Sequence, residues 1–148
     1  NLADHLATQA QWKDVDLITD FPDYPLTLVG IKARLAQVFV NLITNAISFC
    51  EDGDAVRVWA RRRDNRVLIV VEDTGPGIPE QALTKVFKRF YSERPHGQFG
   101  NHSGLGLAIS RQIVEAHGGV IWAENIRPTA ADPTSEPLGA RFVVGLPV

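Results

Sequence analysis

The sequence has 148 residues, of which 45% are hydrophobic and 22% charged, a balance typical of one globular domain with its own core. The formal net charge of −2 does not favour binding to nucleic acid or to an anionic membrane surface. Cys50 is the single cysteine, which excludes an intrachain disulfide and fits a reducing compartment. No apolar stretch approaches the roughly 20 residues of a membrane-spanning helix. The chain starts at Asn1 without a methionine, so we expect it to be a fragment of a longer protein.

Hydrophobic periodicity predicts the elements of the first half. Residues 15–21 alternate and predict a strand, and residues 27–29 fit a second short one. Residues 32–50 carry apolar side chains every three or four positions, which predicts an amphipathic helix. The alternating segment 56–61 predicts a half-exposed strand, and the continuously apolar segment 67–71 predicts a central one, joined to it by a hairpin turn.

The second half adds two helices and two strands, at 79–86, 105–117, 120–124 and 140–146. Pro79 suits the first turn of the shorter helix, and Gly118-Gly119 would end the longer one. Residues 127–139 contain three prolines and no periodicity, so they predict a surface loop. The whole pattern predicts an α/β two-layer sandwich, a mixed sheet with helices on one face.

Three polar side chains interrupt the apolar helix predicted at 32–50. Asn41, Asn45 and Ser48 follow at steps of four and three residues, so they form one polar stripe. Asparagine is a mediocre helix former, so two of them at mid-helix need a reason. Amides that pack against neighbouring loops would provide one. A carboxamide oxygen that ligates Mg²⁺ would provide another, because that ion prefers hard oxygen ligands.

The motif Asp73-Thr-Gly-Pro-Gly-Ile directly follows the predicted central strand. Gly75 and Gly77 allow positive φ angles and a close approach to a planar ligand. Asp73 would be partly buried and would need a hydrogen-bond donor. The donor is either the backbone of the turn itself or the exocyclic amine of adenine, and the motif alone leaves both open.

Aromatic, basic and glycine-rich residues follow between the two glycine motifs. The cations are Lys88, Arg89 and Arg94, and the aromatic residues are Phe87, Phe90 and Tyr91. They are either core anchors with solvated cations, or a hinged lid, mobile without nucleotide, whose cations face phosphate charge. Gly104-Leu-Gly-Leu opens the helix at 105–117, where backbone N–H groups attract phosphate, although a tight helix–loop junction would need the same glycines.

The order of these motifs resembles the catalytic and ATP-binding domain of sensor histidine kinases, within the GHKL superfamily of gyrase, Hsp90 and MutL. The matching stretches begin at Gln37, Asp73, Phe87 and Gly104, and the resemblance covers roughly residues 26–148. It implies the Bergerat-type ATP-binding fold. The aromatic lid favours histidine kinases over gyrase or Hsp90, and the tail at 139–147 is faintly similar to alphaproteobacterial envelope-stress and acid sensor kinases.

The resemblance implies a role for each motif residue. Asn45 would ligate Mg²⁺, and Asp73 would read adenine. Asn41, close to the phosphates, and Arg89, at the terminal phosphate, would be the catalytic residues. The other ATP-binding residues implied are Gly75, Gly77, Ile78, Phe87, Lys88, Tyr91, Arg94, Gly104, Leu105, Gly106 and Leu107.

Two positions depart from the family pattern. Ser48 stands where a lysine is usual, and His102 where a glycine is common. Both support an alternative, a nucleotide-binding regulatory module without kinase activity. A hydrolase or a serine kinase of the same superfamily is a third interpretation. Hydrolysis is disfavoured because the hydrolases usually keep a glutamate where this chain has Asn41.

The resemblance also implies what surrounds the domain. Residues 1–14 would end a linker helix from a dimerisation domain, and residues 15–148 would form the ATP-binding domain. His5 lacks the neighbouring acid of a phosphoacceptor, so the accepting histidine is expected on that separate dimerisation domain, which would also serve a response regulator. The parent would be a homodimer anchored in the bacterial inner membrane, with this domain in the cytoplasm and no nucleic-acid partner.

Overall fold

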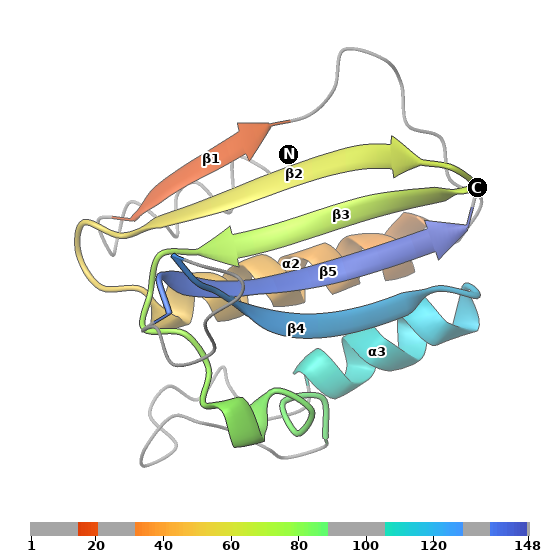
Figure 1. The fold of residues 1–148 in the computed structure, drawn as a ribbon. Coiled ribbons are helices and arrows are strands. Elements are labelled where there is room, and N and C mark those ends of the chain that lie inside the picture. Colours follow the sequence, from red (N-terminus) through yellow and green to blue (C-terminus); the bar gives the residue numbers. More distant parts are fainter. Residues whose placement is uncertain (1–14, 21–31, 89–105, 129–136, 148) are drawn as a thin grey trace.

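The computed structural model describes residues 15–20, 32–88, 106–128 and 137–147 of the chain (Figure 1). The short strand expected at 27–29, the linker segment 1–14 and the basic segment that follows Lys88 lie outside these residues.

The described chain is built on a five-stranded mixed sheet in the order β1-β2-β3-β5-β4. Its strands are β1 (Asp16–Asp20), β2 (Ala55–Arg63), β3 (Arg66–Asp73), β4 (Val120–Ile126) and β5 (Gly139–Pro147). β1 runs parallel to β2, and the remaining pairs are antiparallel. The continuously apolar segment lies in β3, in the middle of the sheet, so the prediction of a central strand is confirmed.

Two helices, α2 (Lys32–Phe49) and α3 (Gly106–Ala116), cover one face of this sheet (Figure 1). The apolar stripe of α2 forms part of the hydrophobic core, and its residues Val38, Leu42 and Ala46 have no exposed surface. The predicted two-layer sandwich is therefore confirmed. Within the described segments, no helix is both long and apolar enough to cross a bilayer.

Both predicted turns around the sheet are confirmed. β2 and β3 form a hairpin whose turn places Asp64 at a positive φ of 56°. α3 ends at a glycine pair, where Gly118 has a φ of 75° and the Gly119 N–H donates to the Val114 carbonyl at 2.9 Å. A left-handed residue just after a helix is the usual place for glycine.

Among the elements that the structure describes, the helix expected at 79–86 is the one that was wrong. The structure has a single 3₁₀ turn, Glu80–Ala82, followed by further tight turns up to Lys88. Pro79 has an extended ψ of 137°, and no side chain caps the turn. A segment this short forms too few hydrogen bonds to offset the unfavourable free energy of helix nucleation. Its path follows from the burial of Ala82, Val86 and Phe87 in the core.

Candidate functional site

The ends of several elements meet on one side of the molecule. β3 ends at Asp73 and β4 at Ile126, while β5 begins at Gly139 and α3 at Gly106, all toward the same side in Figure 1. The Asp73 motif and the start of the glycine helix are therefore brought to one side of the molecule. That region contains the ends of the strands and the start of a helix, where backbone polar groups lack partners within their own element.

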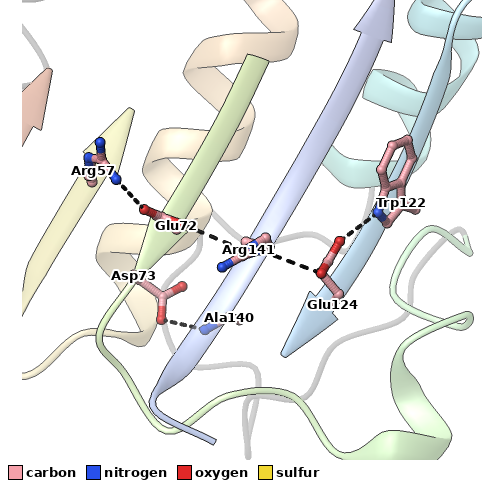
Figure 2. A network of polar contacts seen from close by, with 7 residues as sticks. All are labelled: Arg57, Glu72, Asp73, Trp122, Glu124, Ala140 and Arg141. Atoms are coloured by element: carbon pink, nitrogen blue, oxygen red, sulfur yellow. Dashed lines mark hydrogen bonds and ion pairs between the residues drawn. The ribbon is translucent and has the colours of Figure 1, made fainter. Parts of the chain in front are cut away.

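Asp73 is the buried charge of this region, with only 5% of its surface exposed. Its Oδ1 accepts hydrogen bonds from the Gly75 N–H at 2.9 Å and from the Ala140 N–H at 3.4 Å, the second of which is drawn in Figure 2. Burial raises the pKa of this carboxyl to about 6, and the two backbone hydrogen bonds only partly oppose that increase. Among the described residues, the hydrogen bonds to this carboxylate are made to Oδ1 and none is made to Oδ2.

The two glycines of the Asp73 motif are both closely packed. A Cβ at Gly75 would lie 3.1 Å from Asp73 Oδ1 and 3.1 Å from the Phe49 carbonyl oxygen. Gly77 has a φ of 84°, and its Cβ would lie 2.7 Å from Pro137 Cβ and 2.9 Å from Asn125 Oδ1. The expected positive φ is thus found at Gly77 but not at Gly75, whose role is a close approach.

The same turn is fastened to the sheet at its start. Thr74 exchanges hydrogen bonds with Ala55, from its N–H to the carbonyl at 3.1 Å and from the Ala55 N–H to its hydroxyl at 2.9 Å. The Thr74 hydroxyl in turn donates to Asp54 Oδ1 at 3.0 Å. The first residue after the carboxylate is therefore held against the start of β2.

A second attachment of the turn to the sheet, which the sequence analysis missed, is made by Asn125 near the end of β4. Its Nδ2 donates to the Ile78 carbonyl at 2.7 Å, and its Oδ1 accepts from the Ile78 N–H at 2.7 Å. Asparagine is depleted in strands, so its presence in β4 was the only available signal.

Asn41 joins the two helices of the site. Its Nδ2 donates to the Gly106 carbonyl at 3.1 Å and to Ser110 Oγ at 3.2 Å. A Cβ at Gly106 would lie 3.7 Å from Asn41 Cγ, so the glycine lets α3 begin close to α2. The helix that carries the asparagines and the start of the glycine helix are thus neighbours.

Asn45 and Ser48 lie further along α2. Asn45 is half-buried, one turn beyond Asn41, and the Ser48 hydroxyl donates to the Asn45 carbonyl at 2.5 Å. Ser48 therefore satisfies its hydroxyl within its own helix. In the part of the chain that the structure describes, no three His, Cys, Asp or Glu side chains group closely enough to hold a metal. A carboxamide that works with waters and phosphate oxygens fits the way Mg²⁺ is usually bound.

The apolar site residues belong to the core beside the turn. Ile78 and Phe87 are 8% and 7% exposed, and the Phe87 ring meets Phe142 edge-on with centroids 6.0 Å apart. Leu107 is half-buried against the same core, and Lys88 is exposed. The remaining predicted site residues, Arg89, Tyr91, Arg94, Gly104 and Leu105, lie outside the described residues, as do Phe90 and His102.

A row of alternating charges crosses the sheet next to Asp73. Glu72 pairs with Arg57 at 3.2 Å and with Arg141 at 3.5 Å, and Arg141 pairs with Glu124 at 3.6 Å (Figure 2). The four residues are directly opposite one another in the strand register, so they share one face. Such cross-strand pairs stabilise a sheet. The row holds together the strands whose ends carry the site.

The chain is similar to proteins of known type. The family model for the histidine kinase-, DNA gyrase B- and HSP90-like ATPases matches residues 30–148. The sensor protein ChvG of Rhizobium meliloti (strain 1021) is 44% identical over 138 residues, which is 90% of this chain but 23% of that protein. The chain therefore spans less than a quarter of that relative's length.

Solved structures agree with the sequence relatives. A mycobacterial sensor histidine kinase, MprB, is 28% identical with a TM-score of 0.82, and the match covers 99% of this chain and 90% of that one. Full-length ShkA, solved in complex with AMPPNP, is 26% identical with a TM-score of 0.79 over 99% of this chain and 28% of that one. These findings confirm the predicted fold and the resemblance to sensor histidine kinases.

Proposed function

Because this chain belongs to the histidine kinase-, DNA gyrase B- and HSP90-like ATPase family, we propose that it is the catalytic domain of a sensor histidine kinase. It binds Mg-ATP and delivers the γ-phosphoryl group to a histidine on a separate dimerisation domain. The protein does little covalent chemistry in such a transfer. Its contribution is to position the nucleotide and to stabilise negative charge.

The observation that carries this proposal is the carboxylate of Asp73. A buried carboxylate with a raised pKa is costly unless it meets a partner. Its Oδ1 is held by two backbone N–H groups, and Oδ2 faces no donor among the residues described. The exocyclic amine of adenine is a donor of the right kind, whereas guanine would present an acceptor oxygen.

The contact between α2 and α3 supports the phosphate half of the site. The start of α3 offers backbone N–H groups, and its dipole favours negative charge there. Asn41 bonds to Gly106 at that point, so phosphates bound at the helix start would lie beside the polar stripe of α2. Asn45 would hold Mg²⁺, which neutralises charge on the phosphate oxygens when bound.

The cations of the basic segment complete the assignment. Arg89 would stabilise charge at the terminal phosphate, with Lys88 and Arg94 as further phosphate partners. Gly104, Leu105, Gly106 and Leu107 would provide the phosphate-facing backbone, and Tyr91 would lie against the nucleotide. Ser48 is uncharged and bonds within α2, so the positive charge that faces the phosphates would come from Lys88, Arg89 and Arg94.

The partners and location follow from the same assignment. The phosphoacceptor histidine lies on a dimerisation domain of the parent protein, which is a homodimer and passes the phosphoryl group to a response regulator. The parent is anchored in the bacterial inner membrane, and this domain lies in the cytoplasm. The similarity to ChvG, which is named a sensor protein, supports this setting.

Phosphoryl transfer provides the test. The isolated chain is incubated with γ-labelled ATP, with and without the dimerisation domain of its parent. We expect no label on the chain alone and acid-labile label on the added domain, as phosphohistidine requires. Robust label on the isolated chain, or none on the added domain while ATP is bound, would contradict the proposal.

A further inference from the structure

We propose that Asn125 is a positioning residue, which holds the glycine-rich turn 75–78 in the shape that receives the nucleotide base. The inference rests on the proposed ATP-binding function and adds a residue that none of the sequence motifs contains. Asn125 belongs to β4, 47 residues away from the turn that it holds.

The side chain of Asn125 clamps one backbone residue at two points. The side-chain amide of Asn125 accepts from the N–H and donates to the C=O of the same residue, Ile78, at 2.7 Å in both cases. A neighbouring strand would satisfy a backbone residue in the same way. β4 is an edge strand of the described sheet, so the Asn125 amide joins the turn to this edge strand by two hydrogen bonds.

The turn packs so closely against Asn125 that residue 77 has no room for a side chain. Gly77 adopts a φ of 84°, and any Cβ there would approach Asn125 Oδ1 to 2.9 Å. The turn therefore fits against Asn125 only when residue 77 has no side chain. Pro137 lies on the same side, 2.7 Å from that Cβ position.

The Asn125 amide fixes the end of the turn at Ile78, whereas Asp73 bonds to its start at Gly75. Near its start, the turn is held by the Asp73–Gly75 hydrogen bond and by the contacts of Thr74 with Ala55. At its other end, the only hydrogen bonds among the described residues that hold Ile78 to the sheet are those of Asn125. A turn that is fixed at both ends loses less conformational entropy when a ligand binds.

Removing the amide should therefore weaken nucleotide binding more than it weakens the fold. We expect Asn125→Ala to raise the Kd for ATP about tenfold. In the parent kinase it should raise the KM for ATP by a similar factor and leave kcat within about twofold, because the phosphate contacts are made elsewhere. Asn125→Asp keeps an acceptor for the Ile78 N–H but sets an oxygen against the Ile78 carbonyl, so it should not restore affinity.

Val114→Ala is a matched control for general destabilisation. Val114 is completely buried in α3, away from the turn, so its truncation leaves a cavity and lowers the midpoint of thermal unfolding. We expect this variant to bind ATP as the unsubstituted chain does at a temperature where both are folded. Hydrogen exchange of the Ile78 amide gives a readout that needs no ligand, and it should be faster in Asn125→Ala, which removes the acceptor, but not in Val114→Ala.

The outcomes separate the inference from the function on which it rests. Faster exchange at Ile78 together with unchanged ATP affinity in Asn125→Ala would overturn the positioning role alone, and unchanged exchange would overturn the clamp. If Val114→Ala weakened ATP binding as much as Asn125→Ala, the effect would be structural and the inference would fail. Absence of ATP binding by the unsubstituted chain would overturn the proposed function itself.

Discussion

Replacing Asp73 with asparagine should stabilise the fold at neutral pH while it removes nucleotide binding. The carboxyl is 5% exposed, and burial raises its pKa from 3.8 to about 6. Above pH 6 the folded protein must therefore keep a charge that its surroundings disfavour. Asparagine has nearly the same shape and an oxygen that can accept from Gly75 and Ala140, but it carries no charge.

The pH dependence fixes the size and sign of the effect. Because the folded pKa lies above the unfolded one, the folded state binds more protons between these two values, and stability decreases as the pH rises through about 6. At roughly 1.4 kcal/mol for each pKa unit, a shift of about two units costs about 3 kcal/mol when Asp73 is ionised. Asp73→Asn should recover up to that amount at pH 8 and almost none of it at pH 3.5, where the wild-type carboxyl is already protonated.

Urea unfolding at pH 3.5, 5, 6.5 and 8 measures this difference directly. Asp64→Asn makes the same chemical change at the exposed hairpin turn between β2 and β3, at a residue whose positive φ asparagine tolerates. We expect that control to change the free energy of unfolding by no more than about 0.5 kcal/mol at any pH. A difference between wild type and Asp73→Asn that does not grow between pH 5 and pH 8 would refute the burial argument.

Three further results are expected. The affinity of the unsubstituted chain for ATP should decrease by up to about tenfold for each pH unit below 6, since protonated Asp73 no longer offers a carboxylate to adenine; a flat calorimetric profile from pH 7 to 5 would count against this. Asn45→Ala should abolish the increase in ATP affinity that Mg²⁺ causes, measured by titration with Mg²⁺ or with EDTA; an unchanged increase would mean that another residue holds the ion. Gly77→Ala should cost more unfolding free energy in urea than Gly53→Ala, because both have positive φ angles but only Gly77 lacks room for a Cβ; equal costs would mean that the packing against Pro137 is unimportant.

The layers of this fold could be predicted because burial leaves a period in the sequence. The stripe of α2 and the apolar run of β3 both became core elements. The helix expected at 79–86 failed because its apolar residues have a helix-like spacing, yet they reach the core through successive tight turns. Local periodicity does not distinguish these two paths.

The parts of the candidate site that lie in short motifs can be proposed from the sequence, whereas the parts that depend on long-range strand register cannot. The Asp73 motif and the asparagines of α2 stand out in the sequence, and in the structure Gly75 lies close to the end of α2 at Phe49 while Asn41 contacts the start of α3. Asn125 belongs to no short motif, and its contact with Ile78 appears only when β4 is placed beside the turn. The charge row through Glu72 and Arg141 depends in the same way on the pairing of β3 with β5.

The central claim is that the end of the sheet around Asp73 is an adenine nucleotide site, and its most direct test is a calorimetric titration of the chain with Mg-ATP and with Mg-GTP. A site that hydrogen-bonds one group of its ligand can discriminate by about 10⁴, and a single contact by less, so we expect ATP to bind at least about 100-fold more tightly than GTP. The preference should disappear in Asp73→Ala, together with measurable ATP binding, while the circular dichroism spectrum of the fold is retained. Equal affinities of the unsubstituted chain for ATP and GTP, or full ATP affinity in the folded Asp73→Ala variant, would contradict the account.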